Sequence, residues 1–67
     1  MQREKIGQAL RDLRGDRSRD EVAKALKISK SALAMYERGE RVPRDEVKLR
    51  IATYFHVPLE SIFFYPN

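Results

Sequence analysis

The chain has 67 residues, which is the size of one domain with a small hydrophobic core. It carries 14 Lys and Arg against 10 Asp and Glu, and the resulting formal charge of +4 favours a polyanionic partner. Because the chain has no cysteine, it can form neither disulfides nor thiolate metal sites. With a single histidine a zinc site is not expected either, so we expect no metal and no cofactor. The sequence shows neither a signal peptide nor an apolar run of the roughly 20 residues that a bilayer needs, so we expect a cytoplasmic protein.

The N-terminal half begins with two predicted amphipathic helices. The first covers roughly residues 3–14 and has four apolar residues at helical spacing, namely Ile6, Ala9, Leu10 and Leu13. Gly15-Asp16 ends it. Ser18 followed by Glu21 has the pattern of a capping box, which predicts that a second helix starts at Ser18. The buried side of this second helix is expected to contain Val22, Ala23 and Leu26.

A third helix is predicted from Lys30 to about Arg38, after an apolar plug at Ile28 and an N-cap at Ser29. Gly39 suits the left-handed conformation just past a helix end. One side of the helical wheel carries two cations, a hydroxyl and small or flexible apolar groups, which are Lys30, Ser31, Ala34, Met35 and Arg38. Such a face suits the major groove of DNA, where phosphates, base edges and thymine methyl groups are within reach. The other side contains Ala32, Leu33 and Tyr36, and we expect Tyr36 to pack in the core.

The C-terminal half contains a charged loop over residues 40–44 and two further predicted helices. The fourth helix begins at Arg44 or Asp45, and its inward residues are Val47, Ile51, Ala52 and Phe55. Val57-Pro58 breaks the chain, and residues 59–63 form a last short helix. With no strand predicted, the expected fold class is all-α, a compact five-helix domain that spans residues 1–67.

Nearly the whole chain, from Ile6 onward, resembles the helix-turn-helix family of phage repressors, Cro proteins and xenobiotic-response-element regulators. The resemblance rests on features distributed along the chain, which are Val22-Ala23, Ser29, Tyr36-Glu37-Arg38-Gly39, Pro43, Val57 and Phe63. It implies a lambda-repressor-like domain whose second and third helices form the helix-turn-helix. In this family the second helix crosses the DNA backbone and the third enters the major groove.

The resemblance also implies roles for individual residues. The base-reading positions are Lys30, Ser31, Ala34 and Met35, and the DNA-backbone positions are Ser18, Arg19, Arg38, Arg41 and Arg44. For these side chains the alternative is an ordinary solvated or core-edge position. Arg14 is expected to pair with Glu37 and to lock the third helix onto the first, the alternative being a solvated glutamate.

The C-terminal segment is strongly apolar for a chain end. Apolar patches on a small domain usually mark an interface, so residues 59–67 are expected to form a dimerisation segment. Its interface residues would be Leu59, Ile62, Phe63, Phe64 and Tyr65. The alternative is that these residues fold back and complete the core.

These features predict a sequence-specific regulator of transcription that binds double-stranded DNA and is not an enzyme. We expect a Cro/C1-type repressor of phage or mobile-element origin, associated with the nucleoid, that binds an inverted-repeat operator as a homodimer. No membrane contact and no small-molecule substrate are expected. The alternative is a protein-interaction module, such as an antitoxin or adaptor, that keeps the scaffold without base-specific readout. A steep fall of affinity for duplex DNA with salt would distinguish the regulator from this module.

Overall fold

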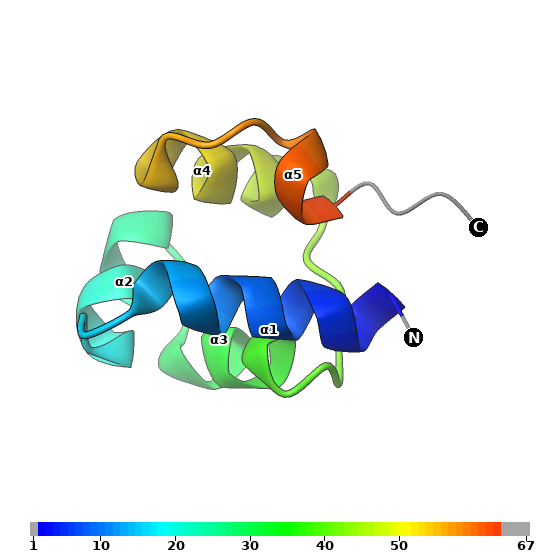
Figure 1. Ribbon diagram of the computed structural model, residues 1–67. Helices are drawn as coiled ribbons and strands as arrows, with labels where there is room; N and C mark the ends of the chain where they lie inside the picture. The colour runs from blue at the N-terminus through cyan, green and yellow to red at the C-terminus, as the bar shows by residue number, and fades with distance from the viewer. Residues whose placement is uncertain (1, 64–67) are drawn as a thin grey trace.

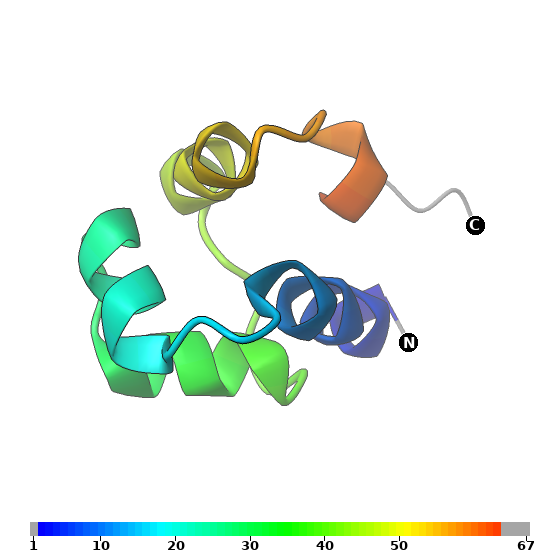
Figure 2. The ribbon, with the colours of Figure 1, turned by 60° about the vertical axis from the view of Figure 1, so that its left-hand side comes forward.

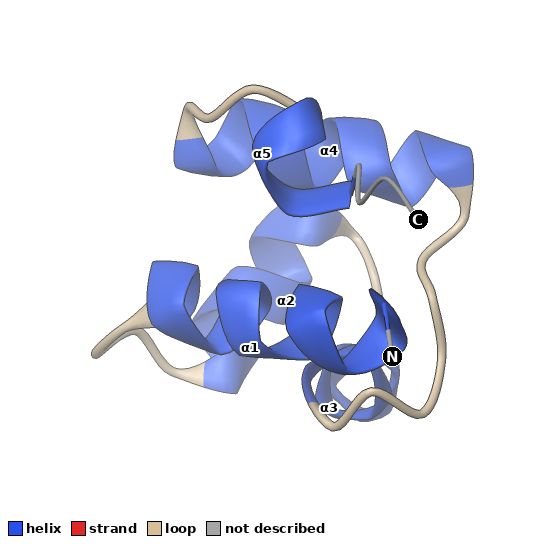
Figure 3. Cartoon of the chain, turned by 45° about the vertical axis from the view of Figure 1, so that its right-hand side comes forward, coloured by secondary structure: helices blue, strands red, loops and turns tan. Residues whose placement is uncertain are grey.

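The computed structural model describes residues 2–63 and has five α-helices in that range. These are α1 (Gln2–Arg14), α2 (Arg19–Leu26), α3 (Lys30–Glu37), α4 (Asp45–Phe55) and α5 (Glu60–Phe63). In Figure 1, α1 runs through the middle of the molecule, with α3 below it and α4 and α5 above it. Figure 3 shows that short loops join the helices and that the described residues contain no strand. The all-α, five-helix prediction is confirmed.

Serine side chains cap the first turns of α2 and α3. The Ser18 hydroxyl accepts a hydrogen bond from the backbone N–H of Glu21 at 3.0 Å. The Ser29 hydroxyl accepts one from the backbone N–H of Ala32 at 2.9 Å. Each bond satisfies a donor that the helix itself leaves free, so both helices begin at the predicted caps.

Four helices end with a residue in the left-handed conformation, and the first of these residues is Gly15 after α1, with φ 56°. Gly39, just past α3, has φ +75°, as its position predicts. Lys27 and His56, which follow α2 and α4, both have φ 59° although neither is a glycine. The backbone N–H groups of Lys27 and His56 donate to carbonyls of the preceding turn. These hydrogen bonds end each helix and turn the chain sharply.

The core draws apolar side chains from every helix. Its buried members are Ile6, Leu10, Val22, Ala23, Leu26, Leu33, Tyr36, Val47, Ile51 and Ile62. Tyr36 is 6% exposed, which confirms the predicted core position. Ile28, in the turn between α2 and α3, packs against this cluster as predicted. Burying this apolar surface holds α2 and α3 at a fixed angle on α1 and α4.

Gly7 allows α1 to pack directly against the end of α3. A Cβ atom at Gly7 would lie 2.5 Å from the carbonyl oxygen of Glu37 and 2.9 Å from that of Tyr36. Backbone atoms cannot yield as the tip of a side chain can. The absence of a side chain at Gly7 therefore sets the spacing between the first helix and the third.

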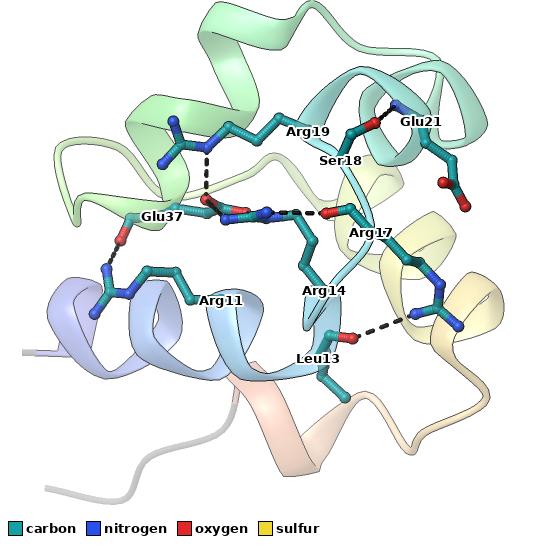
Figure 4. Close-up of polar contacts among 8 residues, drawn as sticks. All are labelled: Arg11, Leu13, Arg14, Arg17, Ser18, Arg19, Glu21 and Glu37. Carbon is teal, nitrogen blue, oxygen red and sulfur yellow. Dashed lines mark hydrogen bonds and ion pairs between the residues drawn. The ribbon is translucent and has the colours of Figure 1, made fainter.

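Arg17 fastens the loop between α1 and α2 to the C-terminal end of α4. Its guanidinium carbon lies 5.6 Å from the ring centroid of Tyr54 and 5.5 Å from that of Phe55. The same guanidinium donates to the carbonyl of Leu13 at 3.3 Å (Figure 4). Arg17 thus covers two half-buried rings and the last turn of α1 with one exposed side chain.

Candidate nucleic-acid interface

The outer face of α3 is open to solvent. Lys30 and Ser31 are exposed, and Ala34 and Met35, one turn further along, are half-buried. The opposite face carries Leu33, which is 1% exposed. In Figure 2, α3 forms the lower edge of the molecule, with the other helices beside or above it. The positions that the sequence assigns to base reading therefore lie together on an accessible surface.

The first turn of α2 lies close to the edge of the molecule that α3 forms. Figure 2 shows α2 rising from the level of α3, so that its N-terminus is close to the same edge of the molecule. Ser18 is exposed and its hydroxyl is engaged in the cap. The partial positive charge of a helix N-terminus at this place attracts an anion such as a DNA phosphate.

An ion pair links the starts of α2 and α3. The Nζ atom of Lys30 lies 3.4 Å from Oδ1 of Asp20. Both side chains are largely exposed. The sequence shows Asp20 as a carboxylate that complements a helix dipole, and it gives no sign of this contact across the turn.

Glu37 is a fully buried carboxylate at the end of α3. Its Oε2 accepts a hydrogen bond from Nε of Arg14 at 2.7 Å, and its Oε1 accepts one from Nη2 of Arg14 at 3.2 Å (Figure 4). The pair that the resemblance implies is therefore present, with the two-point geometry that guanidinium and carboxylate favour. A second cation, Arg19 from the start of α2, donates its Nε to Oε1 at 2.9 Å.

The Glu37 cluster, defined as Glu37 with Arg11, Arg14 and Arg19, joins three helices. Arg11 donates to the backbone carbonyl of Glu37, an acceptor that the end of α3 leaves free. Burial alone raises the pKa of Glu37, but the hydrogen bonds and charges of Arg14 and Arg19 outweigh it, so the pKa lies below its ordinary value. The carboxylate is therefore ionised and fixes the end of the third helix to α1 and α2.

The guanidinium group of Arg19 can make a second contact in addition to the one with Glu37. It was assigned to the DNA backbone, and in the structure its Nε is bound to Glu37 while its side chain remains 36% exposed. In Figure 4 the dashed line from Glu37 ends on Nε of Arg19 and on neither of the two terminal nitrogens of its guanidinium group. The guanidinium can therefore hold Glu37 through one edge and present the other edge to an anion.

The loop after α3 carries the remaining predicted backbone contacts. Arg38, Arg41 and Arg44 are all exposed. Nε of Arg38 lies 2.7 Å from Oε2 of Glu40, a contact that raises the pKa of Arg38 and lowers the pKa of Glu40. Part of the charge of Arg38 is thus offset by its own loop.

The C-terminal segment corrects one prediction. Ile62 was assigned to an exposed dimer patch, but it is 2% exposed within a single chain and completes the core, so this assignment is wrong. Leu59 and Phe63 are half-buried and line a hollow of about 220 Å³ together with Asp45, Lys48 and Glu60. Phe64 and Tyr65 lie outside the described residues.

Other kinds of site find little support in the described part of the chain. Residues 2–63 contain no group of three His, Asp or Glu side chains placed to hold a metal ion. Within the same range, every helix is too short or too polar to cross a bilayer.

Comparison with known proteins gives one match. A family model described as helix-turn-helix matches residues 8–62, which include about half of α1, all of α2, α3 and α4, and all but the last residue of α5. No curated protein and no solved structure matches the chain.

Proposed function

Because this chain belongs to the Cro/C1-type helix-turn-helix family of DNA-binding regulators, we propose that it is a repressor that binds an inverted-repeat operator as a homodimer. The observation that carries the proposal is the exposed outer face of α3, beside the N-terminus of α2. Occupying a promoter is enough to block a polymerase, so repression requires no further chemistry.

Each outward side chain of α3 can recognise a different feature of the major groove. Lys30 can donate to the O6 and N7 acceptors of guanine, and Met35 can pack on the methyl group of thymine. Ser31 can donate or accept, and the small Ala34 allows the helix to approach the base edges closely. The mixed chemistry of this face supports readout of a defined sequence.

Backbone contacts would hold the recognition helix in register. The N-terminus of α2 at Ser18 and the terminal nitrogens of Arg19, which begins that helix, would together bind one phosphate. Arg41 and Arg44 offer cations on the loop that follows α3. Contacts of this kind position the protein on the duplex without reading its sequence.

Dimerisation would place two copies of α3 in successive turns of the groove. Under this proposal, residues 59–67 other than Ile62 would supply the apolar surface for a second copy. Of these, Leu59 and Phe63 line a hollow in the described part of the chain. A two-fold axis between the copies would set half-sites roughly 34 Å apart. An inverted repeat is the DNA sequence that matches such an axis.

Selection of bound oligonucleotides from a random pool tests the proposal, together with a mass measurement of the complex. We expect an enriched inverted repeat with two chains bound. Lys30→Ala and Met35→Ala should each relax the preference at particular positions by about 1–3 kcal/mol. Arg38→Ala should weaken binding to all sequences alike. Equal losses on the selected duplex and on random duplex for all three variants would contradict the assignment.

The salt dependence of binding separates the regulator from a protein-interaction module on the same scaffold. If several phosphates are contacted, log affinity falls with log salt by about 0.9 per phosphate. An affinity for duplex DNA that barely changes with salt, or no measurable affinity, would favour the interaction module.

A further inference from the structure

We propose that Asp20 is a specificity-determining residue of the DNA interface and that it acts on the ammonium group of Lys30; this inference rests on the proposed function. Asp20 lies in the first turn of α2, and Lys30 lies in the first turn of α3. Their charged atoms are 3.4 Å apart, and the side chains are 74% and 61% exposed, respectively. The pair therefore bridges the two helices at the edge that would face DNA.

The contact has little to contribute to the fold. Water screens an ion pair between two exposed side chains, so such pairs add little stability. Asp20 also complements the dipole of α2, but Glu21 does the same from the next position in the same turn. Within residues 2–63, Asp20 is the first-turn carboxylate of α2 that pairs with Lys30, whereas Glu21 makes no ion pair there.

A carboxylate on a DNA-binding face has a cost and a use. Phosphates repel it, so Asp20 weakens binding to duplex DNA of any sequence. Next to Lys30 it offsets the charge that would draw this flexible side chain to the nearest phosphate. Lys30 then gains less from contacts that every duplex offers, and its contribution depends on the acceptors of particular bases. The protein then discriminates between DNA sequences because binding to a duplex without the right bases is weakened.

Binding of Asp20→Asn to two duplexes tests the inference. One is the duplex enriched by selection, and the other is a scrambled duplex of the same length and composition, both measured by fluorescence anisotropy. Asp20→Asn should tighten binding to both duplexes, because a charge that repels phosphates is lost, and the gain should be about threefold to tenfold larger on the scrambled duplex than on the selected one. The ratio of the two affinities therefore falls. Asp20→Glu, which keeps the charge, should retain most of the ratio.

Two further variants separate this effect from a general change of charge. Glu21→Gln removes a neighbouring carboxylate that is not paired with Lys30, so it should tighten binding to both duplexes equally and leave their ratio unchanged. In a Lys30→Met background, Asp20→Asn should no longer alter the ratio. Thermal melting followed by circular dichroism verifies that every variant is folded.

The outcomes distinguish this inference from the proposed function. If the wild-type chain binds both duplexes equally, the proposed function fails and the role of Asp20 fails with it. If the wild type discriminates but Asp20→Asn preserves the ratio, only the role of Asp20 is overturned. An effect that persists without the ammonium group of Lys30 overturns it as well.

Discussion

Glu37 shows how one buried charge can set the geometry of a recognition helix. Its carboxylate is fully buried, and Arg14 from α1 and Arg19 from α2 both donate to it. Taking a carboxylate out of water is costly, and only paired, well-directed donors compensate for that cost. The arrangement specifies where α3 ends relative to its two neighbours, and a weaker network would leave that position less defined.

We expect Glu37→Gln to destabilise the fold by about 3 kcal/mol, the lower end of the range for a broken buried pair. We expect a destabilisation at the lower end of this range because Arg14 and Arg19 are both partly exposed and remain hydrated. Urea unfolding at neutral pH measures the change. The matched control is Glu40→Gln, which removes an exposed partner of Arg38 and should leave stability close to that of the wild type.

The lowered pKa of Glu37 also predicts how stability responds to acid. A depressed pKa in the folded state means that the stabilisation is fully present above the ordinary glutamate pKa of about 4.3. It is lost as the pH falls from there through the folded pKa, because the unfolded chain binds the proton first. The unfolding free energy of the wild type should therefore fall more steeply between about pH 5 and pH 3 than that of Glu37→Gln. Equal slopes for the two proteins would show that Glu37 has the same pKa in both states.

Gly7 gives a second prediction for a single residue. Gly7→Ala should destabilise the protein by about 1–3 kcal/mol, because the added methyl group would lie 2.5 Å from the Glu37 carbonyl oxygen. The effect opposes helix propensity, which favours Ala over Gly by about 1 kcal/mol. Arg3→Ala, at an exposed position of the same helix, is the control and should be close to neutral. A Gly7→Ala variant more stable than the wild type would mean that α1 and α3 can move apart freely.

The ends of α2 and α4 store a small amount of backbone strain. Lys27 and His56 both adopt φ 59°, a region in which a side chain clashes with the backbone and glycine does not. Each of these helices nevertheless closes with the hydrogen bonds of a regular cap. Stability is therefore available at both positions without any new contact.

We expect Lys27→Gly to stabilise the protein by about 0.5–1 kcal/mol, because glycine adopts the left-handed conformation without the clash. Lys24→Gly is the matched control, since it makes the same substitution inside α2. There, glycine should destabilise the protein by about 1 kcal/mol. Thermal or urea unfolding of the two variants gives changes of opposite sign if the cap is formed as described. Destabilisation by both would contradict the left-handed conformation of Lys27.

The sequence predicts the elements well because the signals for them are local. The serine caps before α2 and α3 and the glycine after α3 determine helix ends through bonds and φ angles within one turn. Apolar periodicity correctly placed Leu33 and Tyr36 inside and Lys30 outside. The left-handed conformations of Lys27 and His56 were not predicted, since neither residue type indicates a positive φ.

Contacts between helices were predicted less completely. The Arg14–Glu37 pair was expected through family resemblance, while Arg19 as its third member depends on how α2 crosses the end of α3. The same holds for the contact of Asp20 with Lys30 and for the close approach at Gly7. The prediction for Ile62 was wrong because a short apolar helix has the same sequence pattern whether it packs against a partner or against its own core.

At the scale of the whole molecule, the two proposed surfaces are separate. Figure 2 shows α3 along the lower edge and α5 at the upper right, with α1 between them and α4 beside α5 at the top. A second copy docked on α5 would therefore leave the outer face of α3 open. The buried Ile62 ties α5 to the core, so the dimer surface would be anchored rigidly to the scaffold that carries the recognition helix.

Removing residues 64–67 tests whether the C-terminal segment forms this dimer surface. The deletion spares the described core, so the shortened chain should keep its helical content and its affinity for a single half-site. It should lose the second binding event on a full inverted repeat, which weakens binding there by about tenfold or more, because linkage of two half-site contacts is lost. Leu49→Ser controls for the loss of apolar surface elsewhere, since Leu49 is 58% exposed on α4. Sedimentation of the shortened chain and of Leu49→Ser, each free and with the full duplex, gives the number of chains in each complex. A shortened chain that still binds the full duplex as two cooperative copies would place the dimer contact outside this segment.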